Sequence, residues 1–317
     1  MPTLVCVTGG AGFVATAKGY DVRATVRSLS DAEKISHLTR LAAALPGRLE
    51  LVEADLLGGE GPFVAAFRGC RYVFHCASPF FIEAADPQAE LVDPAVRGTQ
   101  AVMAAAAANK ADVRRVVLTS SCAAIKGCKP VPPKEGSTYS EADWNETSTV
   151  EEEAYWVSKV QAERAAWEAA GRLGVDLVTI LPEFIMGPLI STRIDGTSMG
   201  YMKAWVEGKA QSGAPVFADV RDVARAHILA AENPAASGRY IVANSHTTPA
   251  AHISAWLQER FPEYVFEAGE AGEPQPSINN SRVQRELGLA ITPVRETLQD
   301  MAATLVALGL AQPQRKA

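Results

Sequence analysis

The sequence has few of the features that mark membrane, secreted or nucleic-acid-binding proteins. No run of about 18 apolar residues occurs, so no segment is expected to span a membrane. The 30 basic residues are scattered and the net charge is −6, so no nucleic-acid partner is expected. The first residues carry neither a basic segment nor a cleavage site, which favours a cytoplasmic protein without a signal peptide.

Cysteine and histidine are also scarce, at five residues each. The cysteines form no Cys-x-x-Cys pair, and most lie in or beside apolar runs, which predicts packed, reduced thiols. The histidines form no His-x-x-x-His pattern, so no metal site is predicted. With 48% hydrophobic and 21% charged residues, the composition is that of an ordinary globular protein and excludes a disordered chain.

The pattern of apolar runs predicts the fold class. Short β-branched runs alternate with alanine-rich segments of helical period, which is typical of a parallel sheet with helices on both faces. The predicted strands are Leu4–Val7, Val22–Val26, Leu49–Val52, Tyr72–Cys76, Arg115–Thr119, Leu177–Leu181 and Tyr240–Val242. The predicted helices are Ala32–Ala44, Gly61–Phe67, Ala95–Asn109 and Glu152–Leu173. We therefore expect an α/β protein with a doubly wound, Rossmann-type parallel sheet.

The regular alternation ends after Pro182, where glycine and proline become denser. This change predicts a smaller C-terminal lobe that binds the substrate, made from about residues 183–215 and 246–310. The nucleotide-binding domain would then comprise residues 1–182 and about 216–245, because the strand at Tyr240–Val242 is expected to return to the sheet.

Residues 4–15 have the pattern of a strand, a glycine-rich turn and the start of a helix. Gly9 and Gly12 allow a tight turn and close approach of the backbone to a pyrophosphate, and a helix N-terminus offers free N–H groups to an anion. The spacing Gly-x-x-Gly-x-x-Ala is one residue wider than the usual fingerprint, so a plain tight turn is the alternative. We expect a dinucleotide site.

The end of the second predicted strand indicates which dinucleotide is bound. An NAD site has an acidic residue there, whereas this chain has Arg27, with Lys34 seven residues later. Two cations suit a 2′-phosphate, so NADP(H) is predicted as cofactor; a solvated basic pair is the alternative. Asp55, after the third strand, offers a carboxylate to the adenine amino group.

Tyr155 and Lys159 are spaced i, i+4 near the start of a long predicted helix, which places them on one helix face. An ammonium group beside a phenol favours the phenolate and makes tyrosine a better acid–base group near neutral pH. An exposed tyrosine beside a solvated lysine is the alternative.

Ser120 and Ser121 follow a buried predicted strand, at the end where open α/β sheets bind ligands. A serine hydroxyl there is able to hydrogen-bond a substrate carbonyl, although either serine is also a candidate cap for the next segment. The chain lacks the Gly-x-Ser-x-Gly elbow, which disfavours a serine hydrolase.

Taken in order, these motifs resemble the extended short-chain dehydrogenase/reductase family, and within it the dihydroflavonol reductase and cinnamoyl-CoA reductase branch. The resemblance covers nearly the whole chain. It is carried by residues 7–13, 23–27, 74–79, 93–99, 119–121, 155–159, 181–188, 219–224 and 292–298.

The resemblance implies a catalytic set of Ser121, Tyr155 and Lys159, with Ser121 preferred because the family's active serine is the second of the pair. Tyr155 would be the general acid in hydride transfer to a carbonyl, and Lys159 would hold the nicotinamide ribose. The implied cofactor contacts are Gly9, Gly12, Phe13, Val14, Arg27, Lys34, Asp55, Leu56, Cys76, Ala77, Ser78 and Pro182.

Three features depart from the family pattern. Lys126 stands where dihydroflavonol reductases have Asn or Asp, and residues 153–159 differ from the cinnamoyl-CoA reductase signature, so neither substrate is implied. Only residues 13–18 lie between Gly12 and Gly19, about two helical turns fewer than in the family, which predicts a shortened first crossover helix.

The leading hypothesis is an NADPH-dependent oxidoreductase that reduces an aldehyde or ketone, with a small-molecule carbonyl compound as partner. An NADP-binding sensor or scaffold without turnover is one alternative, because the first helix is short. An NAD-dependent sugar-nucleotide epimerase is another, disfavoured by Arg27. The sequence leaves the oligomeric state open.

Overall fold

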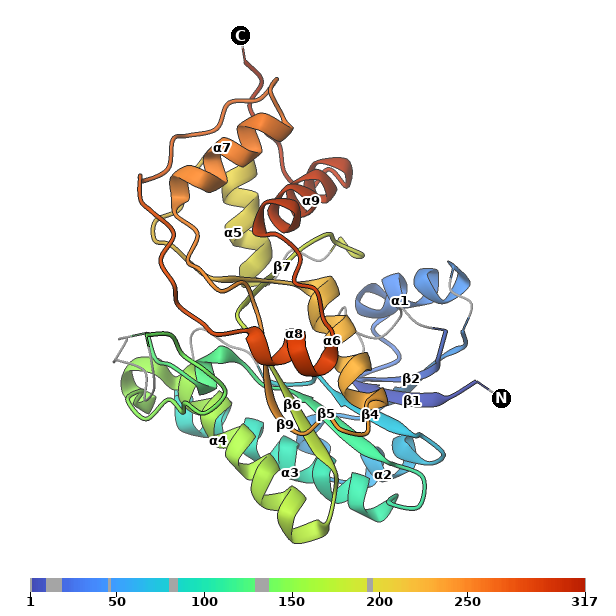
Figure 1. Ribbon diagram of the computed structural model, residues 1–317. Coiled ribbons are helices and arrows are strands. Elements are labelled where there is room, and N and C mark those ends of the chain that lie inside the picture. The colour runs from blue at the N-terminus through green and yellow to red at the C-terminus, as the bar shows by residue number, and fades with distance from the viewer. Residues whose placement is uncertain are drawn as a thin grey trace.

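The computed structural model describes residues 2–9, 19–44, 47–79, 85–128, 137–192 and 196–316. Its centre is a seven-stranded parallel sheet with the strand order β3-β2-β1-β4-β5-β6-β9 (Figure 1). The strands are β1 (Leu4–Thr8), β2 (Asp21–Val26), β3 (Leu49–Glu53), β4 (Tyr72–His75), β5 (Arg115–Thr119), β6 (Leu177–Pro182) and β9 (Gly238–Val242). Each predicted strand is present, within two residues at either end, and the doubly wound α/β class is confirmed.

Helices cover both faces of the sheet (Figure 1). On one face lie α2 (Gly61–Phe67), α3 (Asp93–Ala108) and α4 (Val150–Leu173), and on the other lie α1 (Ala32–Ala44), α6 (Val220–Glu232) and α8 (Ser281–Leu287). Every residue of β6 is buried, because side chains on both faces of this strand meet a helical layer. Such strands read as continuous apolar runs, which is why the sequence identified them. Short turns of helix, η1 (Leu56–Gly58), η2 (Gln88–Val92) and η3 (Cys122–Ala124), follow or precede the main elements.

A smaller lobe stands beyond the carboxyl edge of the sheet (Figure 1). It contains β7 (Phe184–Met186) paired in parallel with β8 (Phe217–Asp219), and the helices α5 (Thr197–Val206), α7 (Ala250–Arg260) and α9 (Val294–Ala307). These elements enclose their own core around the fully buried Trp205, Phe217 and Met202. The sequence did not reveal β7 and β8, because three residues are too few to show a periodic pattern.

The strand order reverses direction at β1, which is flanked by β2 on one side and β4 on the other. Open α/β sheets bind ligands in the crevice at such a switch point, outside the carboxyl ends of the strands. The predicted shortened helix, with Gly12, Phe13 and Val14, lies outside the described residues. In the described part of the chain, no helix is both long and apolar enough to cross a membrane.

Candidate active site

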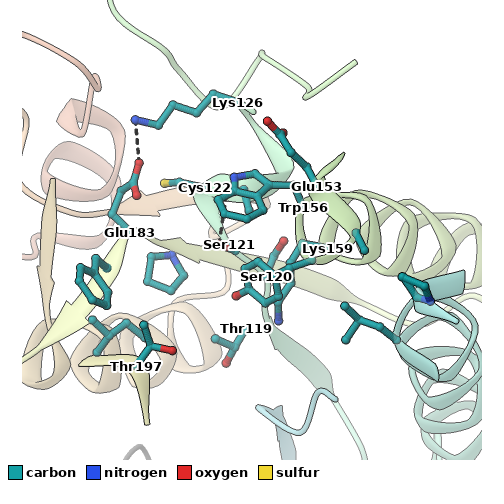
Figure 2. A pocket seen from close by; sticks show the side chains of 18 of the residues that line it. Thr119, Ser120, Ser121, Cys122, Lys126, Glu153, Trp156, Lys159, Glu183 and Thr197 are labelled. Atoms are coloured by element: carbon teal, nitrogen blue, oxygen red, sulfur yellow. Dashed lines mark hydrogen bonds and ion pairs between the residues drawn. The ribbon is translucent and has the colours of Figure 1, made fainter. Parts of the chain in front are cut away.

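A cavity of about 910 Å³ opens where β5 and β6 end and α4 begins (Figure 2). Its wall includes Ser121, Tyr155, Lys159 and Pro182, four residues that the sequence analysis singled out. Ser121 follows β5, Pro182 ends β6, and Tyr155 and Lys159 lie near the start of α4. The carboxyl ends of the two parallel strands and the first turns of α4 therefore meet at one edge of the sheet. The other lining residues include Leu91, Thr119, Ser120, Cys122, Lys126, Glu151, Glu152, Glu153, Trp156, Glu183, Phe184, Ile185 and Thr197.

The two serines at the end of β5 differ in their hydrogen bonds. Ser120 Oγ donates to Oε2 of the buried Glu163 at 2.6 Å, so its only proton is already used. Ser121 Oγ instead accepts a hydrogen bond from the N–H of Ala123 at 3.1 Å, as the N-cap of η3. Ser121 therefore keeps its hydroxyl proton for a group in the cavity, and the geometry favours Ser121 over Ser120 as a donor.

Tyr155 and Lys159 lie on the same face of α4, one turn apart. The helix is interrupted just before them at Glu153, whose φ of −141° and ψ of 50° are not helical. Lys159 Nζ lies 5.6 Å from the centre of the Tyr155 ring, within the range of a cation–π contact. The ammonium of Lys159 therefore lies beside the ring of Tyr155 at the wall of the cavity, and the catalytic pairing of the two groups stays a prediction.

Lys159 also connects α4 to the segment that follows β4. Its Nζ donates to Ser78 Oγ at 3.1 Å, and Ser78 Oγ donates to the carbonyl of Pro79 at 3.3 Å. Ser78 therefore contacts one of the catalytic candidates directly, and the contact of Cys76, Ala77 and Ser78 with the cofactor stays a prediction.

The turn after β1 packs closely against this segment. Gly9 has a φ of +69°, and a Cβ at this position would lie 2.9 Å from Ala77 Cα. The N–H of Ala77 donates to Thr8 Oγ1 at 3.2 Å, and Thr8 Oγ1 lies 2.7 Å from His75 Nδ1. Burial lowers the pKa of His75 to about 3, so this imidazole is neutral. Glycine is thus required at position 9 both by the positive φ of the backbone and by the close contact with Ala77.

A second buried histidine, His227, joins α6 to the end of β5. His227 Nδ1 lies 2.7 Å from the carbonyl of Val223, which only accepts, so Nδ1 carries the proton and Nε2 accepts from Thr119 Oγ1 at 2.7 Å. Thr119 Oγ1 also lies 3.2 Å from Cys76 Sγ. Burial raises the pKa of the Cys76 thiol to about 11, so the thiol stays protonated near neutral pH. Sequence reasoning missed His227, which lies 108 residues from Thr119.

The residues expected at the adenine end of the cofactor lie along the opposite part of the sheet edge. Arg27 is exposed directly after β2. Asp55 Oδ1 accepts the N–H of Leu57 as the cap of η1, and Leu56 packs against Gly98 of α3, where a Cβ would lie 2.9 Å from Leu56 Cδ2. The side chain of Lys34, like Gly12, Phe13 and Val14, lies outside the described residues.

One end of the cavity carries an ion pair that the sequence did not indicate. Lys126 Nζ lies 2.9 Å from Glu183 Oε1, and Figure 2 shows the two side chains meeting across the cavity wall. Burial raises the pKa of Glu183, while the neighbouring ammonium opposes that rise. Among the described residues, no cluster of histidine, cysteine and carboxylate side chains forms a metal site.

The fold is a Rossmann-type α/β fold, with a cavity at the carboxyl ends of its parallel strands, where such folds bind their ligands. The model of the NAD dependent epimerase/dehydratase family matches residues 5–244, and the chain belongs to that family. Cinnamoyl-CoA reductase CAD2 of Medicago truncatula is 36% identical over 95% of this chain and 95% of that protein. Dihydroflavonol 4-reductase of Arabidopsis thaliana is 35% identical over 82% of this chain and 70% of that protein.

The fold of this chain also matches the solved structure of a reductase. The yeast methylglyoxal/isovaleraldehyde reductase Gre2, complexed with NADPH, matches with a TM-score of 0.81 and 27% identity over 97% of this chain and 99% of that chain. The family and branch expected from the order of the motifs are therefore confirmed.

Proposed function

We propose that this protein reduces an aldehyde or ketone with NADPH, with Tyr155 as the general acid. The chain is an oxidoreductase that uses NADP(H), in keeping with relatives named as reductases and a structural neighbour complexed with NADPH. The observation that carries the finer proposal is the meeting of Ser121, Tyr155 and Lys159 in one cavity.

The described residues fit a dinucleotide. Gly9 has no side chain and so lets the turn after β1 pack against Ala77, and the neutral His75 places no charge beside this turn. In this proposal the exposed Arg27 binds the 2′-phosphate, Asp55 and Leu56 contact the adenine side, and Cys76, Ala77, Ser78 and Pro182 contact the nicotinamide side. When bound, NADPH supplies the hydride that adds to the carbonyl carbon.

The chain's own groups act on the carbonyl oxygen. Ser121 donates its free hydroxyl proton in a hydrogen bond and orients the carbonyl. Tyr155 transfers its phenolic proton to the same oxygen as the C=O π bond is lost and the alcohol forms. Lys159, held by Ser78, stabilises the negative charge that develops on Tyr155.

The cavity favours an uncharged substrate. Its wall is largely apolar, with Leu91, Trp156 and Phe184 among its members. Lys126 is neutralised by Glu183, and Glu151 and Glu152 are exposed on the lining, so a negatively charged substrate is repelled. We propose that the lobe made by residues 183–215 and 246–310 selects the rest of the substrate.

The direct test is NADPH consumption with a panel of uncharged aldehydes and ketones. The wild-type protein should turn over at least one class, and Tyr155→Phe should lower kcat by about 10²–10⁴-fold, because proton donation is lost. Equal turnover by Tyr155→Phe would reject the assigned acid.

Thermal stabilisation by NADPH separates this proposal from a sensor. Stabilisation without turnover of any carbonyl compound would favour a sensor, and stabilisation by NADH in preference to NADPH would favour the epimerase alternative. The cytoplasmic location stays a prediction.

A further inference from the structure

A carboxylate outside the cavity is completely enclosed beside the catalytic candidates. Glu163 lies on α4, one turn beyond Lys159, and is 1% exposed. A lone carboxylate is costly to bury, so its partners indicate what it does.

Glu163 is saturated with hydrogen bonds. Its Oε2 accepts from Ser120 Oγ at 2.6 Å and from Arg239 Nη2 at 3.2 Å. Its Oε1 accepts from Arg239 Nε at 2.8 Å, from Thr179 Oγ1 at 2.9 Å and from Trp167 Nε1 at 3.2 Å. The donors come from β6, from β9, from α4 and from Ser120 directly after β5, so one side chain ties the ends of these segments to the helix that carries Tyr155 and Lys159.

Arg239 extends this network to the segment that precedes α4. Its Nη1 donates to the carbonyls of Glu141 and Asp143 at 2.9 and 2.5 Å, and its guanidinium lies 3.9 Å from the centre of the Trp144 ring. The Glu163–Arg239 pair is thus bidentate and buried, with 0% and 8% side-chain exposure.

A buried ion pair is weak evidence for stability, because desolvation offsets most of its attraction. Its better-attested contribution is to specify one geometry. Here the geometry specified is the position of Ser120, and hence of its neighbour Ser121, relative to α4.

We propose that Glu163 is a positioning residue that acts through Ser120 to set the distance between the Ser121 hydroxyl and the phenol of Tyr155. Only the kinetic test of this inference, the measurement of kcat, rests on the proposed function. Ser120 connects Glu163 to the catalytic candidates, because its hydroxyl donates to Glu163 and its neighbour in the chain is Ser121.

Two variants that each lose one hydroxyl bond to the same carboxylate separate positioning from stability. Ser120→Ala removes the bond toward Ser121, whereas Thr179→Val removes an equivalent buried bond toward β6. Ser120→Ala should lower kcat by about 10–100-fold with little change in KM, because small misplacements of reacting groups slow the reaction strongly. Thr179→Val should lower Tm by about as much as Ser120→Ala does, and it should leave kcat within about twofold of the wild-type value.

The proposal would be overturned if kcat for Ser120→Ala stayed within about twofold of wild type, or if Thr179→Val lowered kcat by as much as Ser120→Ala does. Glu163→Gln should lower kcat more than Ser120→Ala, and soluble Ser120→Ala protein keeps the test decisive if Glu163→Gln does not fold.

Crystal structures of wild type and Ser120→Ala with NADPH form the second arm, which needs no substrate. Ser121 Oγ should move relative to Tyr155 in Ser120→Ala, and an unmoved Ser121 would overturn the proposal. If wild type reduces no carbonyl compound, the proposed function fails while this arm still decides the positioning role.

Discussion

Lys159 Nζ donates a hydrogen bond to Ser78 Oγ at 3.1 Å, across 81 residues of sequence. This contact joins the helix that carries Tyr155 to the segment after β4, at the point where the strand order reverses. Among the described residues, the Lys159 ammonium is held by a neutral hydroxyl and forms no ion pair with a carboxylate.

Removing the Ser78 hydroxyl should therefore loosen Lys159. We expect Ser78→Ala to lower kcat/KM by about 10-fold, because a hydrogen bond to a charged group contributes roughly 1.5–3 kcal/mol. Steady-state kinetics with NADPH and a carbonyl substrate would measure this. Ser281→Ala, which removes a hydroxyl that accepts from Arg285 on the exposed face of α8, is the matched control and should leave kcat/KM unchanged.

The close packing of Gly9 and Ala77 should make position 9 intolerant of a side chain. Gly9→Ala and Gly19→Ala both place alanine at positive φ, +69° and +74°, which costs about 1–2 kcal/mol each. A Cβ at Gly9 also collides with Ala77, whereas a Cβ at Gly19 meets no described atom within 4 Å. Isothermal titration should show NADPH binding weakened by about 10-fold or more in Gly9→Ala only. Equal weakening in both variants would contradict the packing argument.

The ion pair of Lys126 and Glu183 should determine how strongly the cavity prefers a neutral substrate over a negatively charged one. Glu183→Gln leaves the ammonium of Lys126 uncompensated, so the kcat/KM ratio for a keto acid over the matching neutral ketone should rise by about 10-fold. The double variant Lys126→Met/Glu183→Gln removes both charges and should return the ratio toward that of wild type. An unchanged ratio in Glu183→Gln would place the pair outside the substrate's reach.

The buried imidazoles should make the fold sensitive to mild acid. Burial lowers the pKa of His227 from 6.5 to about 4, so below pH 6.5 the unfolded chain binds a proton that the folded chain does not. The stability from neutral His227 is complete above pH 6.5 and is lost progressively as the pH falls toward 4, by about 2 kcal/mol at pH 5.

Thermal melts between about pH 7.5 and about pH 4.5 measure this loss. His227→Gln should show a shallower fall in Tm than wild type, and His246→Gln, at an exposed position, should show the same fall as wild type. A wild-type Tm that does not change over this range would contradict the burial of a neutral imidazole.

Much of the fold was predictable because its strands are buried on both faces. The residues of β5 and β6 form continuous apolar runs that leave little choice of structure. The pairing of β7 with β8 was not predictable, because each has three residues and their neighbours lie far apart in sequence. The segment Tyr155–Lys159 was identifiable by its helical spacing, and its catalytic role stays a proposal.

The ion pairs of the site had no sequence signal at all. Lys126 meets Glu183 and Glu163 meets Arg239 through pairings of strands and helices, and a scattered charge looks the same in sequence whether it is solvated or buried.

The sequence alone determined the seven strands of the main sheet and the helices α1 to α4, since apolar periodicity is a local property that each of these segments carries by itself. It also determined which residue types stand at the carboxyl ends of β1, β4, β5 and β6. Only the tertiary structure showed which of the two adjacent serines keeps its hydroxyl proton for the cavity, because the proton of Ser120 is donated to Glu163, 43 residues away. Hydrogen bonds between distant side chains exist only once the sheet and α4 have packed together.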